Sequence, residues 1–287
     1  MAAAFFNDMA NFTGGNPTGE NPPDGVVIPY YFEEEPAGEV TLRILKDSEE
    51  VVSFSSGAES GGGEMGMFGG GGGGGNVSAK KGANQFVWNM RYPGAELLEN
   101  AVFQGSSAGP LAPPGSYAVE LTVDGETLRQ PFEIVKDPGT EYSDAVLQEQ
   151  FEFLISVRDK MSETMSLVRR MREMRDDGMD RVVQAGGGNN LARAMAALND
   201  KLYPLEERLV QYRARAGQDL IAQPTGVDSK LGRLLSFASM ADGPPTQGQR
   251  DLFVRLSTVI AEHAAALGEV ERNEYAALVR MTGGLIP

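Results

Sequence analysis

The sequence contains no cysteine and only one histidine, His263. The absence of cysteine excludes disulfide bonds, thiolate metal sites, iron–sulfur clusters and cysteine nucleophiles. A single histidine cannot build a multi-histidine metal site, and it is the only candidate base for a serine–histidine–aspartate triad. Several familiar classes of enzyme are therefore excluded. We expect a chain that is not an enzyme, with no catalytic residues, no metal ligands and no cofactor.

Basic residues and long apolar runs are also scarce. The sequence has 25 lysines and arginines but 40 aspartates and glutamates, so the formal net charge is −15. Such a charge repels phosphate backbones, and we expect no nucleic-acid partner. No apolar run approaches the roughly 20 residues that cross a bilayer, so we expect no membrane span. No signal peptide is readable, because the initial apolar run Ala2–Phe6 is short and follows no basic region.

The 287 residues are sufficient for two domains, and 41% of them are apolar. Residues 1–25 are rich in asparagine, glycine and proline, which favours an extended N-terminal arm that lies along another surface. Residues 26–137 follow with the two-residue apolar period of β-strands.

One hairpin is strongly indicated within this β region. The alternating run Tyr117–Val123 is followed by Asp124-Gly125 and then by a second alternating run that contains Pro131. An Asp-Gly pair favours a type I′ turn, because both central residues need positive φ. Proline lacks a donor for the ladder, so its strand should lie at an edge or carry a bulge. Short strands between Gly/Pro turns predict an Ig-like antiparallel β-sandwich over 26–137.

A glycine-rich insertion, residues 57–75, interrupts this β region. Twelve of its 19 residues are glycine, which is typical of a flexible loop. Its apolar side chains, Met65, Met67 and Phe68, are candidates for docking on a partner. No Lys-Ser/Thr pair and no helix start follow, so the insertion does not resemble a phosphate-binding loop.

From Ser143 onward the apolar period is helical. One apolar face is formed by Leu147, Phe151, Leu154, Met161, Met165 and Val168. A second seam alternates steps of four and three, through Leu191, Met195, Leu198, Leu202, Leu205, Leu209 and Tyr212. We expect Gly178 and Gly186–Gly188 to break the first helical pattern, Pro204 to kink or divide the second helix, and Gly217 to end it.

Two further helices are expected. One follows Asp228 with Leu231, Leu234, Leu235 and Ala238 facing inward. The other begins at Thr246, where Gln249 completes a capping box, and ends near Gly283. Together these patterns predict an up-down bundle of about four helices over 141–282, followed by a tail of residues 283–287. The expected fold class is α+β and multidomain.

Four constellations could carry chemistry, but ordinary structural roles suit each better. His263 lies on an apolar stripe, and Glu33–Glu35 are adjacent acids that alternate faces of a strand. Asp176–Asp180 lacks the spacing of a calcium loop and suits a helix C-terminal turn. Trp88 on an alternating strand favours a core position, whereas an outward Trp88 or Tyr92 would form a platform for sugars.

A cluster of basic residues, Arg169, Arg170, Arg172 and Arg175, lies near the expected end of the first long helix. Basic residues there favour the helix dipole and suit a solvated face. The alternative is a docking surface for an acidic partner. The partner-docking candidates in the whole chain are Met65, Met67, Phe68, Phe5, Phe6, Phe12, Arg169 and Arg172.

Three motifs resemble a known family: NPPDGVVI at 21–28, FVWNMRYPGA at 86–95 and GPLAPPGSY at 109–117. They are similar to the region after the propeller in bacterial sortilin-like, BNR-repeat proteins, which are often labelled glycosyl hydrolases. Residues 198–202 and 239–246 extend the resemblance into the helical part. The propeller that would hold a hydrolytic site is missing here, so no catalytic residue transfers. The resemblance implies an extracytoplasmic, periplasmic location, with a cytoplasmic one as the alternative.

These observations predict a non-catalytic structural or interaction subunit. It would dock on other protein subunits of a larger complex, of which a membrane-embedded assembly is one example, through the N-terminal arm, the glycine-rich loop and the helical domain. The alternative is a carbohydrate- or peptide-binding accessory module of a secreted hydrolase system. A third hypothesis, a hydrolase with an unusual carboxylate pair, requires two converging acids with a raised pKa.

Overall fold

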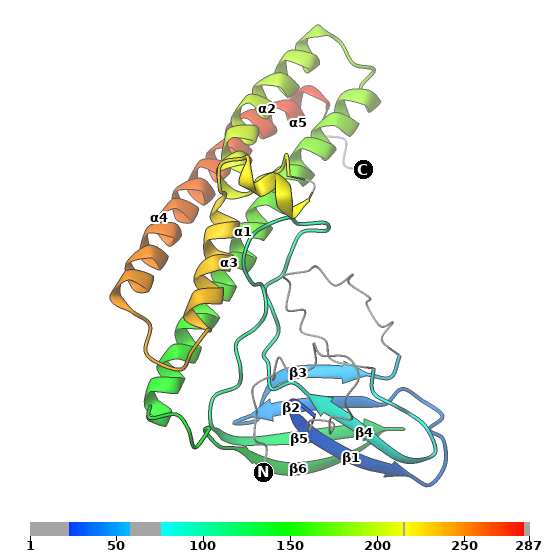
Figure 1. The fold of residues 1–287 in the computed structure, drawn as a ribbon. Coiled ribbons are helices and arrows are strands. Elements are labelled where there is room, and N and C mark those ends of the chain that lie inside the picture. Colours follow the sequence, from blue (N-terminus) through cyan, green and yellow to red (C-terminus); the bar gives the residue numbers. More distant parts are fainter. Residues whose placement is uncertain (1–22, 58–75, 215, 284–287) are drawn as a thin grey trace, which may run out of the picture. The chain divides into compact units, whose positions relative to one another are not determined.

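The computed structural model describes residues 23–57, 76–214 and 216–283, and these residues form an α+β protein with two antiparallel sheets and a set of helices (Figure 1). The coarse fold class expected from the sequence is therefore confirmed. The chain divides into two units, which are described separately. The β unit contains residues up to Gly94, Ala108–Phe153 and Ala241–Pro244, and the helical unit contains Ala95–Ser107, Leu154–Met240 and the residues from Pro245 onward.

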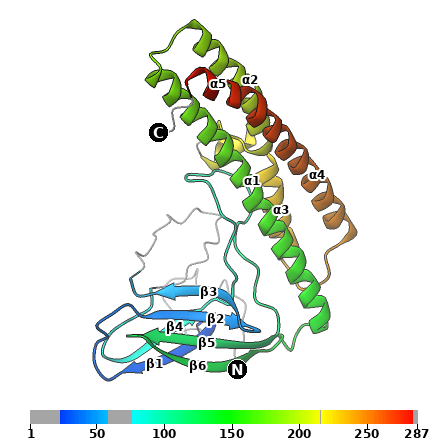
Figure 2. The ribbon, with the colours of Figure 1, turned by 180° about the vertical axis from the view of Figure 1, so that it is seen from behind.

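Six strands form the two sheets of the β unit. They are β1 (Val26–Phe32), β2 (Thr41–Lys46), β3 (Glu49–Ser55), β4 (Gly82–Trp88), β5 (Gly115–Val123) and β6 (Glu126–Ile134). The larger sheet has the order β3-β2-β5-β6, and β1 pairs with β4 in the smaller one (Figure 2). Every pairing is antiparallel.

The β5–β6 hairpin confirms the prediction made from Asp124-Gly125, since these residues have φ values of 48° and 86°. β6 is an edge strand, as Pro131 predicted. A second turn, between β2 and β3, also has positive φ at both central residues, Asp47 (49°) and Ser48 (71°). It contains no glycine, so the sequence pattern did not reveal it.

Side chains from both sheets share one apolar core in the β unit. Trp88 is only 1% exposed, and its ring packs beside Tyr117 and Phe132 with centroids 6.1 and 6.3 Å away. The indole Nε1 donates a hydrogen bond to the carbonyl oxygen of Arg91 at 3.2 Å. The predicted core position of Trp88 is confirmed, and its polar atom has a partner.

The helices begin with α1 (Asp144–Gln184), whose first residues belong to the β unit, and α2 (Asn189–Leu209). A short 3-10 turn, η2 (Gly217–Ile221), leads to α3 (Val227–Ala238). The last helical run is α4 (Gln247–Val270), a π-helical turn η3 (Glu271–Tyr275) and α5 (Ala276–Met281). The predicted capping box of Thr246 and Gln249 is confirmed, and so is the buried apolar face of α3.

The prediction that Gly178 interrupts the first helix was wrong, because α1 continues to Gln184. The break predicted at Gly186–Gly188 is confirmed, since α2 begins only at Asn189. A Cβ atom at this position would lie 2.9 Å from Leu278 and 3.1 Å from the sulfur of Met195. The glycine therefore permits close packing inside a helix rather than ending one. Asp176–Asp180 accordingly lies within α1, and its predicted place in a helix C-terminal turn was wrong as well.

The second helix also differs from the prediction. It continues through Pro204 and ends at Leu209, well before Gly217, because Val210 has extended backbone angles of −135° and 149°. Tyr212 therefore lies outside the helix. Between Leu202 and Leu209 the seam buries Glu206, which is 2% exposed, in place of the predicted Leu205, which is half-buried.

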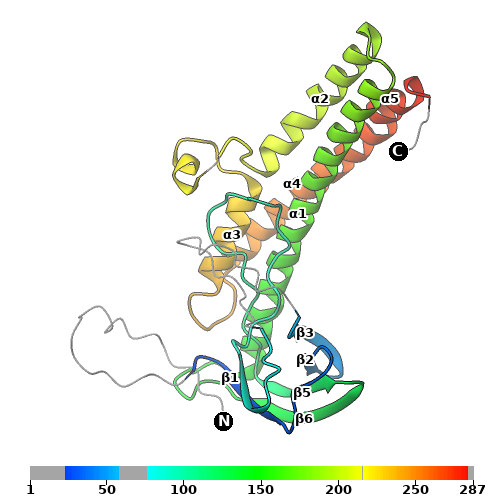
Figure 3. The same cartoon turned by 90° about the vertical axis from the view of Figure 1, so that its right-hand side faces the viewer.

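An irregular segment, residues 95–107, belongs to the helical unit although it lies between β4 and β5 in the sequence (Figure 3). We call it the strap. The backbone N–H of Gln104 donates to the hydroxyl of Ser229 at 3.1 Å, and that of Ser106 donates to the carbonyl of Gly232 at 3.0 Å. A Cβ atom at Gly105 would lie 2.1 Å from the carbonyl carbon of Gly232. The backbones of the strap and α3 thus come into close contact at two glycines, Gly105 and Gly232.

Candidate functional site

Most of the predicted docking residues lie outside the described part of the chain. These residues are Phe5, Phe6, Phe12, Met65, Met67 and Phe68. The same holds for most of the predicted arm, glycine-rich insertion and tail. Arg169 and Arg172 are described, and both lie on α1 within the helical unit.

The arginines of α1 meet a buried carboxylate on α2. Arg172 Nε donates to Glu206 Oε1 at 2.9 Å, and Arg175 Nη1 lies 2.6 Å from Glu206 Oε2. The second contact lies outside hydrogen-bond geometry, so it is a Coulombic ion pair. The Arg175 guanidinium also lies 4.5 Å from the ring centroid of Tyr203. We call Arg172, Arg175 and Glu206 the α1–α2 ion cluster.

The other two arginines contact different parts of the same unit. Arg169 donates to the carbonyl of Leu97 in the strap at 3.3 Å. Arg170 donates to the carboxylate of Glu271, the first residue of η3, and this hydrogen bond raises the pKa of Arg170. The basic cluster thus links α1 to α2, η3 and the strap. A docking role for Arg169 and Arg172 remains a prediction beside these internal contacts.

A second polar cluster connects α1 to the π-helical turn. Asp177 Oδ2 accepts hydrogen bonds from Arg181 Nε at 2.6 Å and from the hydroxyl of Tyr275 at 2.5 Å. Burial favours a raised pKa of Asp177, but these two hydrogen bonds, together with the charges of Arg181 and Arg170, hold that pKa below its usual range. Burial, with the hydrogen bond to Asp177, raises the pKa of Tyr275. The pair suits a structural link, since the carboxylate is ionised and fully engaged.

Asp228 in the first turn of α3 is the acid with the most perturbed titration. Its side chain is buried, its Oδ1 accepts from the backbone N–H of Ser229 at 2.6 Å, and burial raises its pKa to about 7. A raised pKa is one requirement of the hydrolase hypothesis. The other requirement is a second carboxyl group nearby, yet the pKa of Asp228 is set by its burial and by hydrogen bonds with Ser229.

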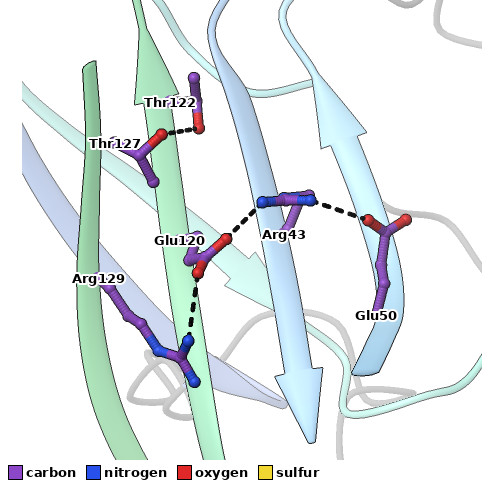
Figure 4. A network of polar contacts seen from close by, with 6 residues as sticks. All are labelled: Arg43, Glu50, Glu120, Thr122, Thr127 and Arg129. Carbon is purple, nitrogen blue, oxygen red and sulfur yellow. Dashed lines mark hydrogen bonds and ion pairs between the residues drawn. The ribbon is translucent and has the colours of Figure 1, made fainter. Parts of the chain in front are cut away.

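The outer face of the larger sheet carries a charged ladder (Figure 4). Glu120 on β5 lies between Arg43 on β2, at 2.5 Å, and Arg129 on β6, at 3.4 Å. Arg43 also reaches Glu50 on β3 at 3.6 Å. Charges of opposite sign therefore alternate across all four strands, which stabilises the pairing.

The remaining candidates occupy structural positions. Tyr92 is half-buried, and its ring packs edge-on against Phe151 with centroids 4.7 Å apart. His263 is half-buried, and its Nδ1 lies 2.7 Å from the carbonyl oxygen of Val259. Glu33–Glu35 are exposed, as predicted, and Glu34 pairs with Lys81 at 2.8 Å. Within the described residues no group of three acids or histidines could hold a metal ion.

The chain matches no known family model, and neither a curated protein nor a solved structure shows significant similarity to it. The resemblance to the sortilin-like region thus stays an expectation. Among the helices in the described part of the chain, none has both the length and the apolar character needed to cross a bilayer.

Sequence reasoning missed three parts of these sites: the burial of Glu206, the burial of Asp228 and the docking of the strap. Glu206 had a weak signal, since it follows Leu202 by four residues and precedes Leu209 by three. That spacing also fits the seam, but the apolar Leu205 was assigned to this position instead. The strap had no signal, because its contacts join residues that are far apart in the sequence, such as Gln104 and Ser229, 125 positions apart.

Proposed function

We propose that this protein is a non-catalytic structural subunit that docks on a larger protein assembly. The main support is the burial of Trp88, with Tyr92 packed against Phe151. A carbohydrate-binding module needs an exposed aromatic platform, and neither residue offers a free ring face of that kind. The accessory-module alternative therefore has less support than docking.

The state of the acids supports a role without catalysis. Glu206, Glu120 and Asp177 are each held by two polar partners, and Asp228 stands apart from them in the first turn of α3. Acid–base catalysis needs a pair of carboxyl groups whose environments separate their pKa values around one substrate. The described residues fit structural ion pairs better than that arrangement.

The helical unit offers a surface for docking on the outer side of α3. Phe237 on α3 is 64% exposed, and Met240, two residues past the end of α3, is 73% exposed. The opposite side of α3 buries Leu231, Leu234 and Leu235. Large apolar and aromatic side chains of this kind anchor protein interfaces when a partner covers them. We propose that the predicted arm and glycine-rich loop contribute further contacts to the same assembly.

The finer architecture belongs to this proposal. We propose that the two sheets over 26–137 form an Ig-like sandwich and that the helices over 141–282 form an up-down bundle, as in the region after the propeller of sortilin-like proteins. The same resemblance supports a periplasmic location, which fractionation of the source cells would test. Recovery of the chain in the cytoplasmic fraction would contradict it.

Native extracts of the source organism test the docking itself. The tagged chain should migrate in a complex far larger than 30.7 kDa, and Phe237→Glu should release it. Leu128→Glu is the matched control, because Leu128 is a similarly exposed apolar residue in the β unit. A native chain that migrates alone, or a complex equally insensitive to both substitutions, would overturn docking through α3.

A further inference from the structure

The two sheets of the β unit have four outer strands, and three of these are protected against further pairing. β6 contains Pro131, β1 contains Pro29, and β3 has a register shift opposite Ile44 and Leu45 next to two glutamates. Proline, bulges and charges are the usual devices that prevent a free edge from pairing with another strand. β4 (Gly82–Trp88) has none of them: its seven residues include no proline and no charge, and its pairing with β1 is regular.

The orientation of the free groups on β4 follows from Pro29, which lies opposite Gln85. A proline is tolerated in a strand where its nitrogen faces away from the neighbouring strand. Opposed residues of an antiparallel pair share this orientation, so the N–H and C=O of Gln85 point to the free edge of β4. By alternation the same holds for Ala83 and Val87. Among the described residues, the backbone of β4 pairs only with β1.

The face beside this edge is uncharged in a chain whose net charge is −15. Neither β1 nor β4 contains a single acidic or basic residue. Val27 and Tyr31 on β1 are 42% and 67% exposed, and Ala83 and Gln85 on β4 are exposed as well. A strand added along β4 would therefore meet exposed, uncharged surface rather than the acidic surface typical of this chain.

The sequence of β4 is complementary to itself. In an antiparallel pairing of two β4 strands centred on Gln85, Gln85 would face its own copy and Ala83 would face Val87. The two glutamine amides can hydrogen-bond to each other, and the small Ala83 leaves room for Val87. No like charges would oppose each other, so the usual penalty for like charges across strands is absent.

We infer that the free edge of β4 binds a second copy of this chain. Two copies would pair antiparallel about a two-fold axis at Gln85 and form a continuous β1-β4-β4-β1 sheet. Such an interface is isologous and satisfies the free N–H and C=O groups of both strands. This interface uses β4 rather than α3, so the experiments on the dimer and on the proposed docking can give independent results.

The mass of the purified full chain in solution tests this inference. Light scattering coupled to gel filtration, from about 1 to 100 µM, should show a particle of twice 30.7 kDa. Gln85→Lys would place two ammonium groups beside each other on the axis and should weaken the dimer about tenfold or more. Gln85→Glu should do the same with two carboxylates. Mixing the two variants should restore the dimer, because opposite charges then meet.

Gln130→Lys is the matched control, since Gln130 is an exposed glutamine on the edge strand β6, and its dimer should be as stable as that of the native chain. Trp88 emission and near-ultraviolet circular dichroism report whether each variant keeps the native β unit. Three results would overturn the inference: a native chain that is monomeric at 100 µM, a dimer that Gln85→Lys leaves unchanged, or natively folded Gln85 variants that fail to associate on mixing. A monomer would instead direct attention to an extended segment of another protein as the occupant.

Discussion

Replacement of Glu206 should strongly destabilise the helical unit. Its carboxylate is 2% exposed, 2.9 Å from Arg172 Nε and 2.6 Å from Arg175 Nη1. Glu206→Gln keeps the shape of the side chain and removes its charge. Arg172, whose side chain is 38% exposed, can turn to water, but the side chain of Arg175 is only 14% exposed and would keep an uncompensated charge.

Removing one partner of a buried ion pair costs about 3–5 kcal/mol, and partial exposure of Arg172 places Glu206→Gln near the lower end, at about 3 kcal/mol. The control is the next residue. Glu207 pairs with Arg213 at 3.1 Å, and both side chains are largely exposed, at 41% and 55%. Exposed pairs contribute about 0–1 kcal/mol, so Glu207→Gln should be nearly neutral.

Urea denaturation followed by two signals measures this difference. Circular dichroism at 222 nm reports mainly on the helices, and emission of the single tryptophan, Trp88, reports on the β unit. Glu206→Gln should lower the midpoint of the circular dichroism transition with little change in its slope. If Glu206→Gln and Glu207→Gln agree within about 0.5 kcal/mol, the buried ion cluster does not stabilise the fold as argued here.

Four other changes should alter the stability of the chain in predictable directions. Gly105→Ala should destabilise the chain by about 3 kcal/mol or more, because Gly105 has a φ of +99° and a Cβ there would collide with the backbone of Gly232. Gly248→Ala should stabilise it by about 0.5–1 kcal/mol, because a Cβ at Gly248 on α4 meets no other atom. Melting temperatures of the two variants test this difference. Asp228 has a raised pKa of about 7, so its contribution to stability is complete below about pH 4 and is lost as the pH rises to 7. The free energy of unfolding should therefore fall by about 2–4 kcal/mol over this pH range in the native chain but not in Asp228→Asn. Denaturation at several pH values measures this fall. A fragment of residues 141–287 lacks the strap and should melt at lower temperature than the helices of the full chain, which thermal circular dichroism would show.

The sequence predicted features that depend on neighbouring residues. Alternation located most of the strands, and the Asp124-Gly125 pair located a turn because its glycine signals positive φ. The equivalent turn at Asp47-Ser48 was not predicted, because Ser48 stands where glycine would signal positive φ and serine rarely adopts it. Local patterns therefore identify a turn when the residue type is specialised and miss it when tertiary structure supplies the constraint.

The errors arose where a distant contact decides the outcome. Glycine usually disfavours a helix, but at Gly178 the absence of a side chain lets Leu278 and Met195 pack closely against α1. A glutamate such as Glu206 is usually exposed, but its ion pairs with two arginines of α1 make its burial possible. Neither partner can be identified from the local window, so the candidate sites were less predictable than the elements that carry them.

The polar contacts of α1 have a further role that follows from the composition of its buried face. Met161, Met165, Met171 and Met174 are all fully buried or nearly so. Methionine is flexible and adapts to many partners, so a methionine-rich face fixes the register of a helix poorly. The α1–α2 ion cluster accepts few alternatives, because a shift would leave a buried charge unpaired.

This reasoning separates register from stability. The triple variant Arg172→Met, Arg175→Met, Glu206→Leu removes all three charges of the cluster together, so its unfolding free energy should stay within about 1–2 kcal/mol of the native value or exceed it. Its packing should nevertheless become less uniquely defined, with poorer dispersion of the methionine methyl signals in NMR spectra than in the native chain. Equally dispersed spectra in a variant of native stability would show that the apolar faces of α1 and α2 fix their register without the charges.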